Sequence, residues 1–257
     1  MARERKEARR LRVAALLRAL HAARPDPRVE LDHQGPFQLL IATILSAQCT
    51  DARVNEVTKS LFAAYPDAAA FARARRAALE AAIRPTGFFR SKAKSIKECC
   101  RALLERHGGE VPRTMEEMTR LAGVGRKTAN VVLGAGYGIP SGIVVDTHMA
   151  RVARRLGLTR QSDPEKIERD LMQVVPQEEW IFFSIAMILH GRYVCQARRP
   201  RCGACALNPH CPSNHLESLA AEGRALKAAP RTAPRAARKA ARPAPRAGPH
   251  RPGPHRS

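Results

Sequence analysis

The stretch Leu121-Ala-Gly-Val-Gly-Arg-Lys-Thr-Ala-Asn130 decides the fold of this chain. Its two glycines lie one residue apart, between two apolar runs of helical spacing. This pattern predicts a helix, a tight turn and a second helix at about residues 115–134. Free N–H groups at the start of the second helix form an anion site, and Lys127 falls in the first turn of that helix. The stretch therefore indicates a turn that grips a phosphate, with an amine beside it.

Two other phosphate-binding motifs fail on residue types. A P-loop needs glycine at position 126, which is Arg126, and at position 121, which is Leu121. A dinucleotide-binding fingerprint needs a preceding strand and a third glycine at position 128, which is Thr128. A plain hairpin of two helices, whose glycines only permit the turn, stays open on the evidence of the turn alone.

The charge of the chain points to an anionic partner. Its 257 residues include 45 Lys and Arg against 23 Asp and Glu, a net charge of +22. Residues 220–257 hold +9 of this charge and residues 1–12 hold +4, so +9 remains between them. The body is basic without its termini, which favours nucleic acid as the partner.

Hydrophobic residues make up 44% of the chain, enough for a substantial core. The sequence contains no run of about 18 apolar residues, so it predicts no membrane span. The Arg-rich N-terminus lacks the apolar segment of a secretory signal. We therefore expect an intracellular protein whose cysteines are reduced unless a metal holds them.

Almost every segment between the termini has helical period, which predicts an all-α fold. The expected helices are residues 11–20, 37–47, 53–64, 76–83, 92–107, 164–175 and 180–190, together with one after Asp146. Residues 37–47 are apolar nearly all round and should form a buried central helix. Residues 1–10 and 216–257 are basic and poor in large apolar residues, so we expect them to be disordered.

Four of the seven cysteines form a C-x6-C-x2-C-x5-C pattern: Cys195, Cys202, Cys205 and Cys211. Four thiols in one short loop indicate a metal centre. The single C-x2-C pair favours a [4Fe–4S] cluster over zinc, and unliganded thiols are the third alternative. The same loop is crowded with basic residues, so a metal would fold a basic surface element: Arg192, Arg198, Arg199 and Arg201. The other cysteines are expected in or near a core: Cys49, Cys99 and Cys100.

The segment Gly142-Ile-Val-Val-Asp146-Thr-His148 brings a carboxylate to the start of a helix. Four residues give this helix its apolar face: Met149, Val152, Ala153 and Leu156. Asp146 can be a plain N-cap or a carboxylate that works with Lys127. His148 has no partner ligand one turn further on, so we expect a surface or capping histidine.

Three motifs, in this order, together resemble the endonuclease III family of DNA glycosylases, in the helix-hairpin-helix superfamily. They are the glycine turn with Lys127, the segment Val-Val-Asp146-Thr-His, and the cysteine loop after His190-Gly-Arg-Tyr193. Leu45-Ser-Ala-Gln-Cys-Thr-Asp51 and Gly87-Phe-Phe-Arg-Ser-Lys-Ala-Lys94 match as well. The resemblance covers about residues 11–212 and departs at Ala122, where the family commonly has proline.

The resemblance implies two all-α domains with a DNA groove between them. One is a six-helix barrel domain, residues 34–141, which contains the helix-hairpin-helix. The other joins residues 11–33 to residues 142–215 and carries the [4Fe–4S] cluster loop. The implied activity is base-excision repair of double-stranded DNA: removal of oxidised pyrimidines, then nicking of the abasic site on its 3′ side by β-elimination. The resemblance also implies a monomer that is cytoplasmic and associated with the bacterial nucleoid.

Roles for single residues follow from the same resemblance. Lys127 is the nucleophile that forms a Schiff base, and we expect burial to favour its neutral amine. Asp146 stabilises the cationic sugar as the base departs. Gln48 and Phe88 insert into the duplex, unless they are an ordinary helix-end glutamine and a core phenylalanine. The phosphate is bound by the hairpin: Gly123, Val124, Gly125, Arg126 and Thr128.

Two other functions stay open. An adenine-mismatch DNA glycosylase of the same superfamily usually lacks the hairpin lysine and carries an additional C-terminal domain. A non-catalytic DNA-binding iron–sulfur protein would not require Lys127 and Asp146 together.

Overall fold

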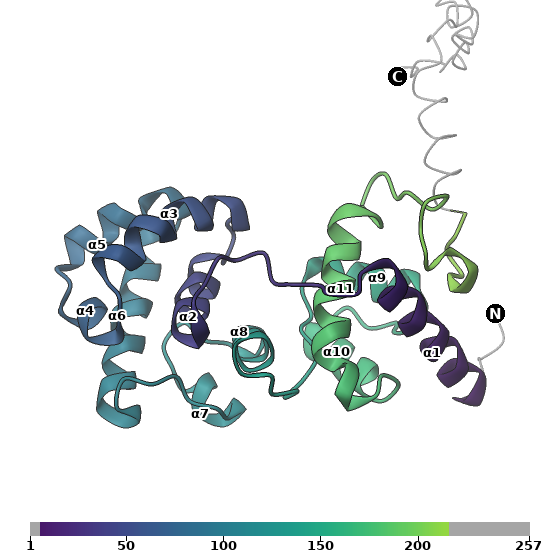
Figure 1. Cartoon of the computed structure of the whole chain (residues 1–257), viewed down its shortest axis with the longest axis horizontal. Coiled ribbons are helices and arrows are strands. Elements are labelled where there is room, and N and C mark those ends of the chain that lie inside the picture. The colour runs from purple at the N-terminus through teal and green to yellow at the C-terminus, as the bar shows by residue number, and fades with distance from the viewer. Residues whose placement is uncertain (1–5, 216–257) are drawn as a thin grey trace, which may run out of the picture. The chain divides into compact units, whose positions relative to one another are not determined.

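The computed structural model of this chain describes residues 6–215, and every regular element among them is helical (Figure 1). The predicted all-α class is confirmed. Residues 1–5 and 216–257, for which we expected disorder, lie outside the described residues. All of the described residues fall within one compact unit, which contains two hydrophobic cores.

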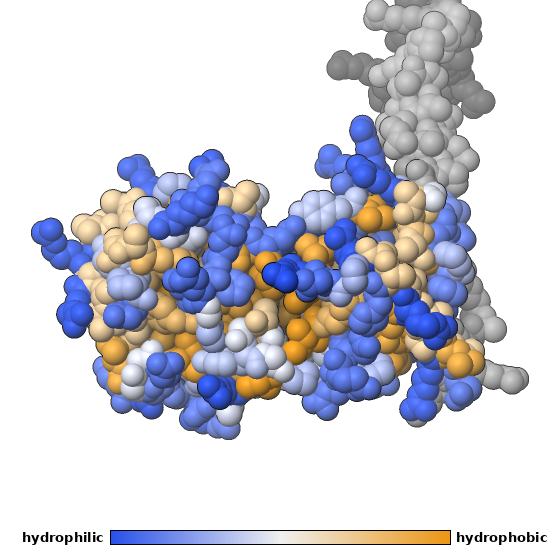
Figure 2. Space-filling view, viewed as in Figure 1, coloured by the Kyte–Doolittle hydropathy of each residue, from blue (hydrophilic) through white to orange (hydrophobic). Residues whose placement is uncertain are grey.

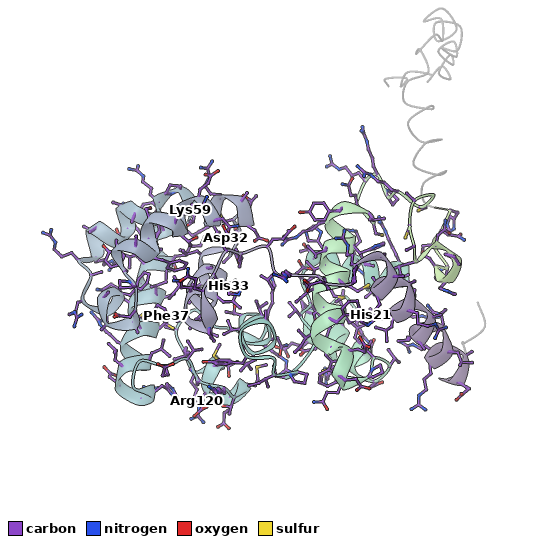
Figure 3. The ribbon with its side chains drawn as sticks, in the orientation of Figure 1. His21, Asp32, His33, Phe37, Lys59 and Arg120 are labelled. Atoms are coloured by element: carbon purple, nitrogen blue, oxygen red, sulfur yellow. The ribbon has the colours of Figure 1, made fainter. Side chains whose placement is uncertain are left out.

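The first core is built by the middle of the chain. Its elements are α2 (Gly35–Leu45), α3 (Asp51–Ala64), α4 (Ala68–Arg73), α5 (Arg76–Ile83), the 3-10 helix η1 (Arg84–Thr86), α6 (Phe89–His107), α7 (Met115–Thr119), α8 (Arg126–Val131) and the π-helix η2 (Val132–Gly136). Every residue of α2 from Leu39 to Leu45 is buried, which confirms the central helix. Phe37 of α2, labelled in Figure 3, lies 5.9 Å from Phe71 between ring centroids.

The second core joins the N-terminal helix to the last third of the described chain. Its elements are α1 (Lys6–Ala23), α9 (Thr147–Arg155), α10 (Pro164–Met172), the 3-10 helix η3 (Gln177–Glu179), α11 (Trp180–Tyr193) and the 3-10 helix η4 (Asn208–His210). His21 of α1, labelled in Figure 3, stacks on Phe182 of α11 with ring centroids 3.6 Å apart. Val29 and Leu31 already pack with the first core, earlier than the expected boundary at residue 34.

Helix α1 begins at Lys6, so the prediction that residues 6–10 are disordered is wrong. Val13, Leu16 and Leu20 anchor this helix in the second core. One turn earlier, Arg9 donates a hydrogen bond to the carbonyl oxygen of Leu158. Since tertiary contacts hold the helix from its buried side, its basic first turn remains helical.

Two other helices also differ from expectation. Helix α4 was not predicted from the sequence; the side chain of Asp67 caps it by accepting from the N–H of Ala70 at 2.7 Å. Helix α10 ends at Met172 rather than at residue 175. Pro176 follows, and a proline disfavours helical backbone at the residue before it, here Val175. The other expected helices are present with ends shifted by a few residues.

Hydrophilic side chains cover much of the face shown in Figure 2, with hydrophobic surface visible between them. No helix in residues 6–215 combines the length and the apolar character needed to cross a membrane. This agrees with the absence of a long apolar run in the sequence.

Candidate active site

The glycine turn has the predicted form, with α7 before it and α8 after it. Gly123 has a φ of +78°, and a Cβ built there would lie 2.8 Å from the Cβ of Ser95 on α6. Gly125 is the N-cap of α8, and nothing lies within 4 Å of a Cβ built at that position. Leu121 and Val124 are buried and fasten the turn to the first core. The turn therefore combines a fixed backbone with an open approach at Gly125.

Lys127 and Asp146 line the same cavity, which has a volume of about 100 Å³. Its walls come from the segment around Glu30, from α2, from α8, from the segment before α9 and from α11, so both cores contribute. Lys127 lies in the first turn of α8, and Asp146 directly precedes α9. The structure thus places on one cavity two residues that are 19 positions apart in the sequence.

Asp146 is the N-cap of α9, and its Oδ1 accepts from the N–H of Met149 at 2.7 Å. The capping role is therefore confirmed, and it fixes the carboxylate at the cavity wall. The apolar face expected for this helix is buried as well: Met149, Val152, Ala153 and Leu156. His148 is half-buried, with its Nδ1 3.2 Å from Nη2 of Arg151.

Lys127 itself is exposed, so the expectation that its amine is buried is wrong. Helix α8 turns its buried face inward only at Ala129 and Asn130, one turn after the glycines. Lys127 also lines the cavity, so its exposed side chain is accessible to a molecule bound there.

Gln48 and Phe88 are the two non-glycine residues with positive φ in the described part of the chain. Their φ angles are 55° and 46°. Gln48 is exposed in the turn between α2 and α3, and Phe88 is the N-cap of α6 with 64% of its surface exposed. The alternative that Phe88 is a core residue is therefore wrong. Residues in this conformation are strained and concentrate at functional sites.

The side chain of Arg126, expected to bind DNA, is engaged within the protein. Its Nε lies 2.6 Å from Oε2 of Glu168, and its Nη2 donates to Oε1 at 3.1 Å. Glu168 is buried and also accepts from Nδ2 of Asn130 at 2.8 Å. This network ties α8, which carries Lys127, to α10 of the second core. Thr128 is half-buried in the same helix.

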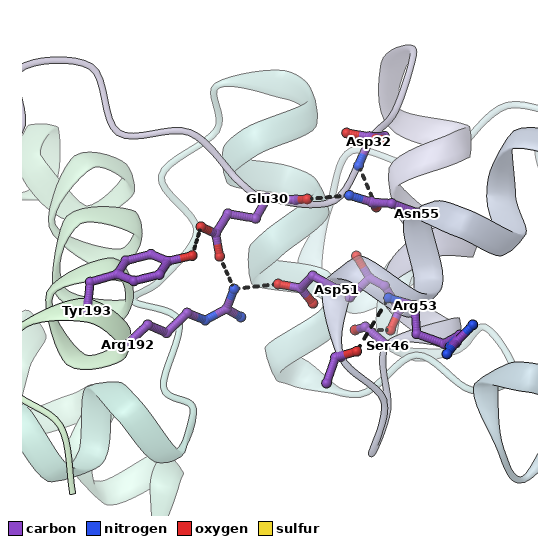
Figure 4. A network of polar contacts seen from close by, with 10 residues as sticks. Glu30, Asp32, Ser46, Asp51, Arg53, Asn55, Arg192 and Tyr193 are labelled. Atoms are coloured by element: carbon purple, nitrogen blue, oxygen red, sulfur yellow. Dashed lines mark hydrogen bonds and ion pairs between the residues drawn. The ribbon is translucent and has the colours of Figure 1, made fainter.

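A second polar network also links the two cores (Figure 4). Nη1 of Arg192, on α11, lies 2.5 Å from Oδ2 of Asp51 at the start of α3 and also pairs with Glu30. The hydroxyl of Tyr193 donates to the same Glu30 carboxylate. The expectation that Arg192 belongs to the basic surface of the cysteine loop is therefore wrong. The other three arginines of that loop are exposed: Arg198, Arg199 and Arg201.

The four cysteines of the loop all line one small cavity between α9, α11 and η4. Sγ of Cys195 accepts from Nη1 of Arg155 at 3.2 Å, and Sγ of Cys205 lies 3.4 Å from Nε2 of His190. Burial raises the pKa of the Cys205 and Cys211 thiols. Within residues 6–215, no three His, Cys, Asp or Glu side chains are arranged to hold a metal ion. The loop gathers its thiols around one space, and the cluster itself stays a prediction.

The remaining cysteines divide as expected between core and near-core positions. Cys99 and Cys100 are fully buried in the first core, and burial raises the pKa of Cys99 to about 12. Cys49 is half-buried beside Gln48. None of the three lines the cavity of the cysteine loop.

Sequence reasoning missed Glu30 and Asn130 in the cavity wall and the pairing of Arg192. It also missed two buried charged residues that support the elements around the site, Glu168 and Lys92. A charged residue on a helix is usually exposed, so nothing in the local pattern marks Glu168 or Lys92 as buried. The position of Lys92 within the segment from Gly87 to Lys94 was the one available signal.

Comparison with known proteins first identifies the class. Residues 41–177 match the family described as HhH-GPD superfamily base excision DNA repair protein. The hairpin, the cavity and this match define a base-excision DNA repair protein of the helix-hairpin-helix class.

Relatives and solved structures narrow the class to one family. Endonuclease III of Synechocystis sp. is 54% identical over 202 residues, covering 79% of this chain and 92% of that protein. Endonuclease III of Escherichia coli is 42% identical over 205 residues, covering 80% and 95%. A non-covalent endonuclease III–DNA complex superposes with a TM-score of 0.77 at 42% identity, covering 82% of this chain and 98% of that one. The chain belongs to the endonuclease III family.

A trapped endonuclease III–DNA covalent intermediate is similar as well, with a TM-score of 0.75 at 43% identity, covering 80% of this chain and 96% of that chain. Membership of this family makes the chain a base-excision repair enzyme. The alternative of a non-catalytic iron–sulfur protein is therefore wrong.

Proposed function

We propose that this DNA glycosylase removes oxidised pyrimidines from double-stranded DNA and nicks the resulting abasic site on its 3′ side through a Schiff base on Lys127. The observation that carries the proposal is the shared cavity of Lys127 and Asp146. A covalent intermediate with DNA in a relative of 43% identity also supports it. A nucleotide must leave the helix to reach such a cavity, at a cost of a few kcal/mol.

The reaction begins when the neutral amine of Lys127 attacks C1′ of the flipped nucleotide. The N-glycosidic bond breaks, and the base leaves with the bonding electron pair and takes up a proton. Positive charge develops on the sugar during this step, and the Asp146 carboxylate, held by its cap to Met149, stabilises it. The nitrogen then loses one proton. The C1′–O4′ bond breaks as O4′ takes up a proton from water, and the nitrogen lone pair forms the C=N bond of the protonated Schiff base. Removal of a proton from C2′ then expels the 3′ phosphate.

Binding would rely on two kinds of contact. The exposed, strained turns at Gln48 and Phe88 would enter the duplex and fill the space left by the flipped nucleotide. Backbone N–H groups at Gly123, Gly125 and the start of α8 would bind a phosphate. Because Arg126 pairs with Glu168, we assign its backbone, rather than its side chain, to this contact.

Borohydride trapping tests the role of Lys127. The unmodified enzyme should form a stable covalent adduct with a duplex containing an abasic site, because borohydride reduces the Schiff base. Lys127→Gln should form none, whereas Lys59→Gln, which changes an exposed lysine of α3, should be trapped like the unmodified enzyme. Equal trapping of Lys127→Gln would show that another amine is the nucleophile.

The base specificity needs a separate test. Incubation with a thymine-glycol duplex should release the base and nick the strand, and an A·G mismatch duplex should stay intact. Release of adenine from the mismatch would favour the adenine-mismatch glycosylase instead. Action as a monomer and association with the nucleoid stay predictions.

We further propose that Cys195, Cys202, Cys205 and Cys211 hold a [4Fe–4S] cluster. All four line one cavity beside α11, and their spacing suits such a cluster. The group would fix the fold of the loop and thereby present Arg198, Arg199 and Arg201 to phosphates.

Metal analysis of the purified protein tests the cluster. The protein should be brown with about four irons per chain. Cys202→Ser should lose iron, and Cys49→Ser, a half-buried cysteine outside the loop, should retain it. A colourless, active protein with one zinc would contradict the assignment.

A further inference from the structure

Lys92 on α6 is a buried lysine that the reaction does not use. Only 5% of its surface is exposed. Its Nζ donates to the carbonyl oxygen of Leu45 at 2.7 Å and to the carbonyl oxygen of Thr86 at 2.8 Å. These two acceptors belong to different segments, 41 positions apart in the sequence.

Each acceptor directly precedes one of the two strained turns. Leu45 is the last residue of α2, and the chain then reaches Gln48 with its φ of 55°. Thr86 ends η1, and Gly87 follows before Phe88 with its φ of 46°. The N–H of Lys92 also donates to the carbonyl oxygen of Phe88 at 3.0 Å. One side chain thus bridges the two segments that carry Gln48 and Phe88.

A lysine suits this position for a physical reason. The last carbonyl groups of a helix have no partner within the helix, and a cation is favourable there. The ammonium group supplies several donors from one point, so it can satisfy both buried carbonyl oxygens at once. Burial lowers the pKa of Lys92, because the charged ammonium group is less well solvated inside the protein than in water.

We propose that Lys92 is a positioning residue for lesion recognition, which holds the turns of Gln48 and Phe88 at a fixed separation so that both enter the duplex together. This inference rests on the proposed insertion of those two side chains. Lys92 itself touches no DNA. Its loss should therefore weaken binding to a site that requires insertion and spare binding that depends on phosphate contacts alone.

Helix α6 also offers a matched control. Lys97, one turn and a half further along, is 9% exposed and caps the end of α4 by donating to the carbonyl oxygens of Ala72, at 2.8 Å, and Ala74. It is a second buried lysine with carbonyl acceptors, but its acceptors lie away from both strained turns. A purely structural role for Lys92 predicts the same behaviour for both lysines.

The experiment measures the Kd of the full chain for two duplexes, one with a tetrahydrofuran abasic-site analogue and one undamaged. Lys92→Met should weaken binding of the analogue duplex by about tenfold to a hundredfold, the range expected for a small misplacement of contact groups. Binding of undamaged duplex should change by less than about threefold. The ratio of the Kd for undamaged duplex to the Kd for analogue duplex should therefore fall. Lys97→Met should leave that ratio unchanged.

Gln48→Ala and Phe88→Ala separate this inference from the proposed function. If they lower the ratio and Lys92→Met does not, the positioning role is overturned while insertion stands. If they leave the ratio unchanged, the insertion itself is overturned. Should Lys92→Met fail to fold, Lys92→Gln is used, because its shorter side chain cannot reach both carbonyl oxygens. A folded Lys92→Gln with an unchanged ratio also overturns the proposal.

Discussion

Gly123 and Gly125 differ in what they require of a side chain, although they lie one residue apart. Gly123 has a positive φ and lies against Ser95, so a side chain there meets both backbone strain and a close neighbour. Gly125 has a φ of −90° and open space around it. Its glycine leaves the start of α8 uncovered, as a phosphate contact through backbone N–H groups requires.

Substitution of the two glycines by alanine should therefore affect stability differently. Gly123→Ala should lower the free energy of unfolding by about 2 to 4 kcal/mol, because it adds left-handed strain to a clash with Ser95. Gly125→Ala should cost about 1 kcal/mol or less, the usual difference at an N-cap. Urea unfolding of both variants measures the difference, and equal losses would contradict the distinction.

Capping decides the start of several elements, and at α9 the cap is also a site residue. Asp146 accepts from the N–H of Met149 at 2.7 Å, and Asp163 accepts from the N–H of Lys166 at 3.0 Å at the start of α10. The two caps are chemically alike, but only Asp146 lines the cavity with Lys127. The capping and electrostatic roles of Asp146 can therefore be separated by substitution.

Asp146→Asn should retain the cap, since asparagine caps about as well as aspartate, and change the free energy of unfolding by less than about 1 kcal/mol. It should lower the rate of base removal by about a hundredfold or more, because the charge facing the developing cation is lost. Asp163→Ala is the control: it should lose about 1 kcal/mol of stability with base removal unchanged. Urea unfolding and single-turnover base release measure the two effects. Full activity of Asp146→Asn would show that Asp146 only caps α9 and has no electrostatic role in base removal.

At the scale of the whole molecule, two polar networks join the cores on either side of the cavity. Arg126 and Asn130 of α8 bind Glu168 of α10, and Arg192 of α11 binds Asp51 and Glu30. A Cβ built at Gly142 would lie 2.2 Å from Oε1 of Glu168, so glycine leaves the room that this carboxylate fills. The first network fixes α8, which carries Lys127, and the second joins α11 to Glu30 and Asp51, which line the same cavity.

Glu168→Gln should lower the free energy of unfolding by about 1 to 3 kcal/mol, because the buried side chain at position 168 loses its charge-assisted hydrogen bonds to Arg126. Glu116→Gln is the matched control, since Glu116 pairs with Arg120 but its side chain is 76% exposed, against 5% for Glu168. That change should cost about 0.5 kcal/mol or less. Chemical unfolding of both variants checks the contrast, and a similar small loss for Glu168→Gln would show that the link between the cores adds little.

Local pattern predicted much of this protein because it acts over short distances. Helical periodicity identified α2, α5 and α9, and the spacing of glycines identified the turn before α8. Periodicity did not predict the first turn of α1, because tertiary contacts rather than the local pattern keep that turn helical. It also failed for Lys92, Lys97 and Glu168, because a charged residue in a helical pattern indicates an exposed face unless its partners are known.

The sequence by itself determined the all-α class, the hairpin with Lys127, the cap at Asp146 and the cysteine spacing, because each depends on residues close together in the chain. Only the tertiary structure decided that Lys127 is exposed, that Asp146 reaches its cavity, and that Arg126 is paired with Glu168. Only the tertiary structure brought one buried ammonium group between Leu45 and Thr86. Such placements depend on how segments far apart in the sequence pack against one another, and local propensity carries no information about that packing.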